Sequence, residues 1–171
     1  MSDNTELQRQ QVDLTFLKET LDKVGIYGHL TPVSDESPLP FLSVQLGLND
    51  QGDQAYIQMM YIPSAEIMDE TNLLQFFAVI PEAGEGVTEQ PIPDSLFAAL
   101  NRRTPFGYFG TDDHGQAFCR YVYALARYTP PNEQVFMEVI DMFTGVLTAF
   151  GSKILAYRRG QLTEAELLQQ I

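Results

Sequence analysis

The sequence is poor in cysteine and in positive charge, and each shortage excludes classes of protein. Its 171 residues hold one cysteine, Cys119, so neither an internal disulfide framework nor a zinc site built mainly from thiolates is available. They hold 10 Lys or Arg against 23 Asp or Glu, a net charge of −13. Proteins that bind a phosphate backbone need clustered cations, so we expect no nucleic-acid partner.

Long apolar runs are missing as well. The apolar stretches are short and interrupted, whereas a membrane helix needs about 20 apolar residues. The polar start MSDNTELQRQQ lacks the apolar segment of a secretory signal. We therefore expect a cytoplasmic protein with no membrane partner. Hydrophobic residues still make up 44% of the chain, which is enough for a substantial core and excludes wholesale disorder.

Sequence motifs of common enzymes are also absent. There is no GxSxG, no GxxxxGK[ST], no GxGxxG after a strand and no HExxH. Two acidic segments, residues 49–53 and 111–115, fit hairpin turns better than metal sites. Cys119 has no base beside it in the sequence, so we expect a buried, inert thiol. We predict no catalytic residue, no cofactor and no metal, and thus a protein that is not an enzyme.

The patterns that are present predict an α+β fold. Sequential hairpins imply antiparallel pairing, so we expect a two-layer domain with an antiparallel sheet of about five strands and three main helices, in the order α-βββ-α-ββ-α. Strand 73–80 is expected to be central and buried on both faces, and residues 26–30 to be a short extended piece. The strands are predicted over 41–48, 54–62, 73–80, 106–110 and 117–126, and the helices over 5–24, 94–103 and 131–158.

The length fits one domain over residues 1–171. Residues 1–4 are expected to be flexible. Residues 160–171 are expected to form a C-terminal helical extension, because Thr163 and Glu166 have the spacing of a capping box. The segment 81–93 is rich in Gly and Pro and is predicted to be the longest loop.

The predicted helix 131–158 has more apolar surface than one sheet covers. Its apolar residues occupy about half of the helical wheel, whereas a helix between a sheet and water needs a stripe little wider than about 100°. Gly145 and Gly151 each cost up to about 1 kcal/mol relative to alanine, and the close approach of another backbone, or a bend, would explain them. We favour a homodimer over packing within one chain. The residues assigned to this seam are Met142, Gly145, Val146, Ala149 and Ser152.

Negative charge is concentrated in one part of the chain. Between Val24 and Asn101 there are eleven acidic residues and no Lys or Arg. Such a stretch keeps a small protein soluble, which is the ordinary explanation. The alternative is that it attracts a basic partner segment, or the basic ends of a second copy.

Residues 100–127 carry a resemblance to a known superfamily. The strings LNRR, FGYFGTDDHG and RYVYAL look like the helix end, strand, DxxG turn and strand of YbjN-like proteins. The element order over nearly the whole chain is similar to that of the type III secretion chaperone-like superfamily. This resemblance implies a homodimeric domain that binds protein segments, and it implies no catalytic residues.

Two functions follow from these patterns. The first is a non-enzymatic, homodimeric adaptor or chaperone-like module that holds a polypeptide, with an exposed apolar patch or a free sheet edge near residues 41–62. The alternative is a small-ligand binder or an enzyme, with a pocket between the sheet and the long helix lined by Tyr and Met.

Overall fold

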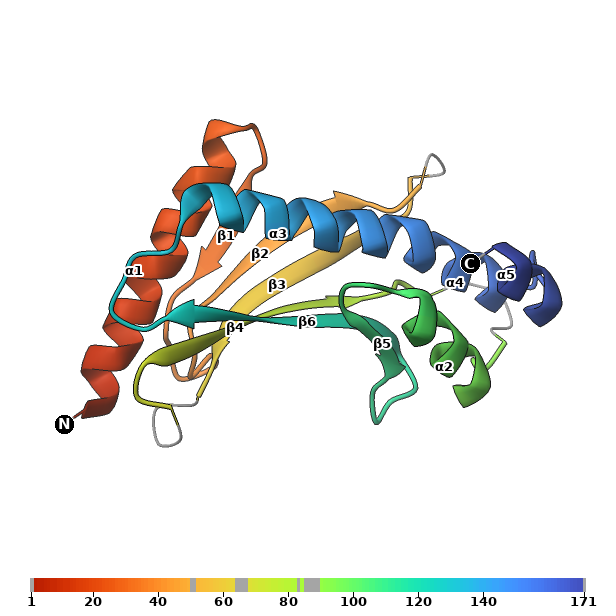
Figure 1. Ribbon diagram of the computed structural model, residues 1–171, viewed down its shortest axis with the longest axis horizontal. Coiled ribbons are helices and arrows are strands. Elements are labelled where there is room, and N and C mark those ends of the chain that lie inside the picture. The colour runs from red at the N-terminus through yellow and green to blue at the C-terminus, as the bar shows by residue number, and fades with distance from the viewer. Residues whose placement is uncertain (1, 50–51, 64–67, 83, 85–89, 171) are drawn as a thin grey trace. The chain divides into compact units, whose positions relative to one another are not determined.

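One antiparallel sheet accompanied by helices makes up the fold (Figure 1). The computed structural model describes residues 2–49, 52–63, 68–82, 84 and 90–170. The strand order is β1-β2-β3-β4-β6-β5. The α+β class is thus confirmed. The strands are β1 (Gly28–Thr31), β2 (Phe41–Gly47), β3 (Gln54–Ile62), β4 (Thr71–Val79), β5 (Tyr108–Thr111) and β6 (Ala117–Ala126). The helices are α1 (Ser2–Lys23), α2 (Asp94–Arg103), α3 (Glu133–Val146), the π-helix η1 (Leu147–Gly151), α4 (Ser152–Arg158) and α5 (Glu164–Gln170).

Two details of the predicted sheet need correction. The expected short extended piece is a sixth strand, β1, which pairs antiparallel with β2 and places Gly28 opposite Val44. Strand β4 lies inside the sheet, but its residues alternate between buried and half-buried rather than being buried on both faces. The apolar side chains of its second face, such as Leu73 and Phe77, keep part of their surface exposed.

The chain divides into two compact units, which are described separately. Unit 1 consists of Met1–Gln45, Tyr56–Phe76 and Val122–Ile140. Unit 2 consists of Leu46–Ala55, Phe77–Tyr121 and Asp141–Ile171. The description of residues 1–171 as one chaperone-like domain stays a prediction.

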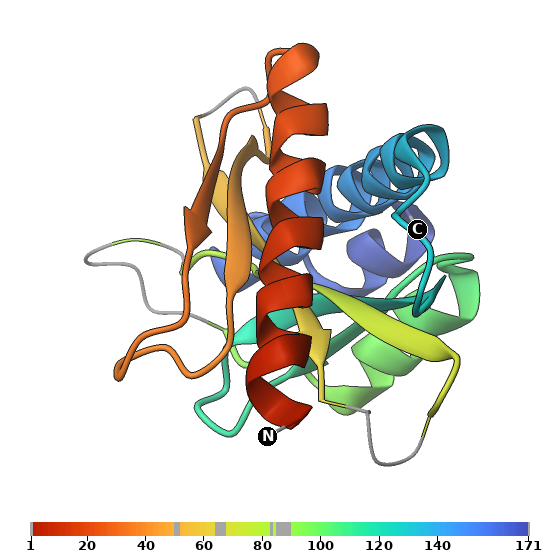
Figure 2. The ribbon, with the colours of Figure 1, turned by 90° about the vertical axis from the view of Figure 1, so that its left-hand side faces the viewer.

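In unit 1, helix α1 lies beside β1 (Figure 2). Its buried face is formed by Leu14, Leu17 and Leu21, each fully buried. The helix ends at Lys23, and Gly25 follows in the turn with a φ of +81°, which is readily adopted only by glycine. The N–H of Ile26 donates to the carbonyl of Leu21, which satisfies one of the last carbonyls of the helix. At its other end the helix begins at Ser2, inside the segment 1–4 that we expected to be flexible.

Two of the buried polar groups of unit 1 have partners within the unit. Arg127 is 8% exposed, and its guanidinium donates to the carbonyl of Met68 at 2.6 Å and lies 3.5 Å from the Glu6 carboxylate. The hydroxyl of Tyr61 donates to Asp13 at 3.3 Å. Burial raises the pKa of Asp13 despite this hydrogen bond, so the carboxyl is a weaker acid than usual. These contacts connect α1 to the sheet of unit 1 and carry no arrangement of catalytic groups.

In unit 2, β5 and β6 form the predicted second hairpin, with Thr111 opposite Ala117. The carboxylate of Asp112 accepts hydrogen bonds from the backbone N–H groups of His114 and Gln116, at 2.9 and 2.8 Å. This confirms the turn interpretation of residues 111–115. Cys119 is fully buried, and burial raises the pKa of its thiol to about 12, so it stays protonated at neutral pH.

The outer edge of β5 is closed by a side chain. Helix α2 lies beside β5 (Figure 1). Asn101 Nδ2 donates to the Phe109 carbonyl at 2.9 Å, and the Phe109 N–H donates to Asn101 Oδ1 at 2.8 Å. The carboxamide thus makes the two hydrogen bonds that a neighbouring strand would make.

Candidate functional site

The long helix contains a feature that the sequence did not reveal. Helix α3 continues through the π-helix η1 into α4, so that Glu133–Arg158 is one helix (Figure 1). A π-helical turn of this kind is rare and frequent at functional sites. It ends at Gly151, which is buried, and a Cβ there would lie 3.4 Å from Leu147 Cδ1 and 3.7 Å from Leu48 Cδ2. These are ordinary van der Waals distances, so alanine would fit at Gly151, but a larger side chain would press on Leu147 and Leu48.

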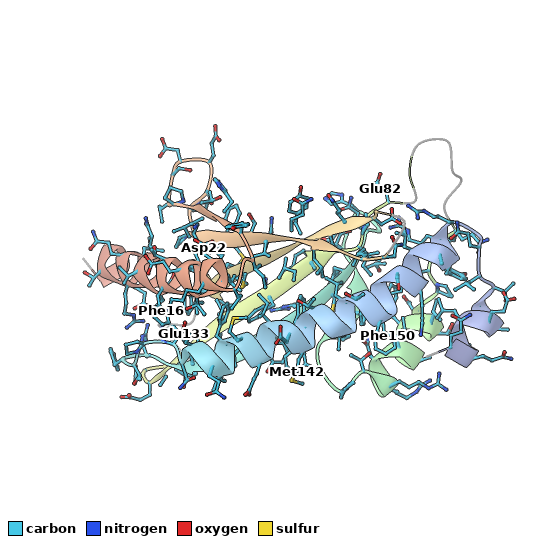
Figure 3. All side chains as sticks on the ribbon, turned by 90° about the horizontal axis from the view of Figure 1, so that it is seen from above. Phe16, Asp22, Glu82, Glu133, Met142 and Phe150 are labelled. Carbon is cyan, nitrogen blue, oxygen red and sulfur yellow. The ribbon has the colours of Figure 1, made fainter. Side chains whose placement is uncertain are left out.

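At Gly145 no neighbouring atom limits the size of the side chain. A Cβ at Gly145 would meet no heavy atom within 4 Å, and the residue is exposed. We call the predicted seam residues around it the outer stripe: Met142, Gly145, Val146, Ala149 and Ser152. Three of them, Met142, Gly145 and Ala149, are exposed, and the other two are half-buried. The Met142 side chain is 49% exposed and projects from the helix into open space (Figure 3).

The same helix corrects our expectation about membrane-length segments. Among the described residues, one helix, Glu133–Arg158, is long and apolar enough to cross a membrane, judged by length and composition alone. The apolar core helix of a soluble protein passes the same test, so this is weak evidence for a membrane. Only 39% of its most apolar stretch is buried inside the protein. We missed it because its apolar residues are separated by single polar ones, which leaves no long uninterrupted run.

A cavity of about 450 Å³ lies in unit 2, at a place that we did not predict. We expected a pocket lined by Tyr and Met between the sheet and the long helix. This cavity is lined mainly by polar residues from α4, from the α4–α5 connection and from α5, together with one residue after β2. The lining residues are Asn49, Ser152, Lys153, Ala156, Arg159, Gln161, Leu162 and Gln170.

An ion pair beside the cavity connects α4 to the β2–β3 turn. Arg159 Nη1 and Nη2 donate to the two carboxylate oxygens of Asp53, both at 2.7 Å. Asn49 Nδ2 also donates to this carboxylate, at 2.9 Å. The hydrogen bonds from Arg159 hold the pKa of Asp53 below its usual value. An acid of the Val24–Asn101 stretch is thus neutralised by a cation of the same unit.

We expect Asp53→Asn to lower the free energy of unfolding by about 1–2 kcal/mol at pH 7, because a two-pronged, charge-assisted hydrogen bond is lost. The ionised Asp53 stabilises the folded chain fully above its unfolded pKa of about 3.9, and this contribution is lost as the pH falls through the lower folded pKa. Urea titrations at neutral and acidic pH measure it.

Glu133→Gln is the matched control for this prediction. Glu133 pairs with Lys23 at 2.7 Å, but both side chains are about half exposed, so removing this pair is expected to cost less than about 1 kcal/mol. If both variants lost the same free energy of unfolding at pH 7, the Asp53–Arg159 pair would stabilise the chain no more than an exposed ion pair does.

No protein-family model matches the chain, and no curated protein matches it in sequence. The resemblance to the chaperone-like superfamily is therefore neither supported nor opposed by these comparisons. The structural basis for a function consists of two features of unit 2. They are the outer stripe, which the sequence predicted, and the polar cavity, whose residues come from separate segments and gave no sequence signal.

Proposed function

We propose that the chain is a non-enzymatic, homodimeric protein-binding module of the adaptor or chaperone-like type, which pairs through the outer stripe. The observation that carries this proposal is the exposed Gly145 in the middle of the long helix, with open space where its side chain would be. The resemblance of residues 100–127 to YbjN-like proteins supports the same function.

A glycine inside a helix destabilises it by up to about 1 kcal/mol relative to alanine. At Gly151 the neighbouring side chains require a small residue, but at Gly145 no described atom does. A second helix that approaches closely would supply the missing reason, since small residues let two backbones come together. Every residue of the outer stripe is uncharged, so pairing there buries no ionised group.

A second copy of the chain fits this surface better than a lipid does. Glu138 and Asp141 are exposed on the same helix, close to Met142. Ionised carboxylates are costly inside hydrocarbon, whereas they remain hydrated at the rim of a protein interface. The same stripe on two copies is self-complementary about a two-fold axis, which is the commonest symmetry of homodimers.

The polypeptide partner is expected to contact side chains rather than to extend the sheet. Strand β1 pairs with Phe41–Val44 of β2, and β3 lies between β2 and β4 in the strand order, so most of the edge near residues 41–62 is already paired among the described strands. We also expected an exposed apolar patch in this region. Tyr56 on β3 is 56% exposed and fits that expectation. A segment with apolar side chains would bind such a surface without adding a strand.

Light scattering of the native protein tests the dimer. The chain has a mass of 19.3 kDa, and we expect a particle of twice that mass for the wild type. Ala149→Glu places a charge in the outer stripe and is expected to give the monomer mass, because an unpaired buried charge costs several kcal/mol, on the order of 3–5.

Ala165→Glu is the matched control, since Ala165 is an exposed alanine of α5 and receives the same substitution. It is expected to stay dimeric. A wild-type mass of 19.3 kDa at every concentration would refute the homodimer. If Ala149→Glu remained dimeric, the dimer interface would have to lie outside the outer stripe.

A further inference from the structure

We propose that the cavity between α4 and α5 binds a small organic anion through a carboxylate or phosphate group. This site shares Ser152 with the outer stripe, but ligand binding there does not depend on the dimer proposed above. The inference rests on the chemistry of the lining side chains, on the charge of Lys153 and on the contacts that fix the cavity walls.

Among the residues that the structure describes, the lining side chains are rich in hydrogen-bond donors and include no acid. They carry three carboxamides, a hydroxyl, an ammonium and a guanidinium around a space of about 450 Å³, and the Ser152 hydroxyl donates to the Thr148 carbonyl. That volume lies within the usual range of small-molecule sites. In a chain with 23 acidic residues and 10 basic ones, two cations and no carboxylate among the described lining residues run against the average composition. An electron-rich ligand matches such a surface, whereas a metal cation does not.

The two cations of the cavity differ in how their charge is balanced. The guanidinium of Arg159 is paired with both oxygens of Asp53. The ammonium of Lys153 donates to the neutral backbone carbonyl of Gln170 at 2.5 Å and lies 5.8 Å from the centre of the Phe150 ring. Among the residues that the structure describes, no carboxylate forms an ion pair with Lys153. Among the described residues, no carboxylate balances the charge of Lys153, and an anion would neutralise it.

The walls of the cavity are held in place by several independent contacts. Helix α5 begins with a capping box, in which the N–H and hydroxyl of Thr163 both donate to Glu166 at 2.8 Å. Leu167 is fully buried, and Arg103 Nη1 donates to the carbonyl of Leu168 at 3.0 Å. Helices α4 and α5 are in contact. A ligand would thus meet a formed site and lose little affinity to ordering of the chain.

The arrangement indicates how the ligand would lie. Its anionic group would meet the ammonium of Lys153, and its other polar atoms would accept hydrogen bonds from the carboxamides of Gln161 and Gln170. Leu162 and Ala156 offer apolar contact for a carbon skeleton. Carboxylates and phosphate esters both supply such an anionic group, and the experiment distinguishes them.

Nuclear magnetic resonance on ¹⁵N-labelled full-length protein tests the site. The probes are citrate and inorganic phosphate, each titrated at constant ionic strength against sodium chloride. We expect saturable shifts of the side-chain amide signals of Asn49, Gln161 and Gln170 with at least one probe. Shifts with citrate alone indicate a carboxylate ligand, and shifts with phosphate alone indicate a phosphate ester.

The charge of Lys153 is tested by substitution. Lys153→Gln is expected to weaken binding about tenfold or more, because a hydrogen bond to a charged group is lost, and Lys153→Arg is expected to retain most of it. Lys18→Gln on α1 removes the same charge from another cation and is expected to change nothing. If Lys153→Gln loosens α5, Gln161→Leu tests the site without changing its charge and is expected to weaken binding as well.

Two results would overturn the proposal. The first is the absence of saturable shifts with both citrate and phosphate. The second is equal affinity of the wild type and Lys153→Gln, which would mean that the shifts report a general salt effect rather than a site.

Discussion

Phe109→Ala is expected to lower the free energy of unfolding by about 3–5 kcal/mol, the largest effect of any substitution proposed for this chain. Phe109 is fully buried in β5. Its ring meets the edge of the Phe150 ring of the π-helix, with 6.0 Å between centroids. The substitution leaves a ring-sized cavity under the long helix, which the close-packed surroundings fill only in part. Because small proteins are stable by only about 5–15 kcal/mol, urea denaturation should show a much lower midpoint.

Tyr108→Ala is the matched control, since Tyr108 precedes Phe109 on the same strand but is 54% exposed. Its loss is expected to stay within about 1 kcal/mol. A double-mutant cycle with Phe150→Ala is expected to give a coupling of about 0.5–1.5 kcal/mol between the two rings. Equal losses for Tyr108→Ala and Phe109→Ala would contradict the burial that separates the two side chains.

The elements found most accurately from the sequence are those with strong local signals. Strand β3 spans Gln54–Ile62 and helix α2 spans Asp94–Arg103, both as predicted. In β3 the apolar residues alternate between two turn segments, and in α2 a Pro-Asp start precedes helically spaced apolar residues. The outer stripe was predicted for a similar reason, because a glycine in a helix is a local anomaly, and its role as a seam stays a prediction.

The elements that were missed depend on parts of the chain that are distant in sequence. Strand β1 has four residues and no clear alternation, and it becomes a strand because β2 pairs with it. The ion pair between Asp53 and Arg159 joins residues that are 106 positions apart. The sequence around either residue contains no signal that predicts the other as its partner. The cavity combines polar residues whose individual positions look like ordinary surface. The π-helix over Leu147–Gly151 has no periodic signal of its own.

The last prediction concerns Asn101, whose carboxamide closes the edge of the sheet. Asn101→Leu is expected to lower the free energy of unfolding by about 2–4 kcal/mol, because it leaves the N–H and the carbonyl of Phe109 without partners in a partly buried place. An open edge also offers a strand site to a second chain. We therefore expect this variant to form concentration-dependent assemblies larger than the wild-type particle, measured by light scattering beside the urea titration.

Arg102→Leu separates this effect from the general effect of an added leucine. Arg102 is the exposed neighbour of Asn101 on α2, and its substitution leaves both hydrogen bonds to Phe109 in place. It is expected to keep wild-type stability within about 0.5 kcal/mol and to keep the wild-type mass. If the two variants behaved alike, Asn101 would not be closing the edge, and strand addition at β5 would become the better account of how a polypeptide binds. If they differ as expected, Asn101 protects this edge, and the proposed polypeptide partner would instead bind a side-chain surface such as that around Tyr56.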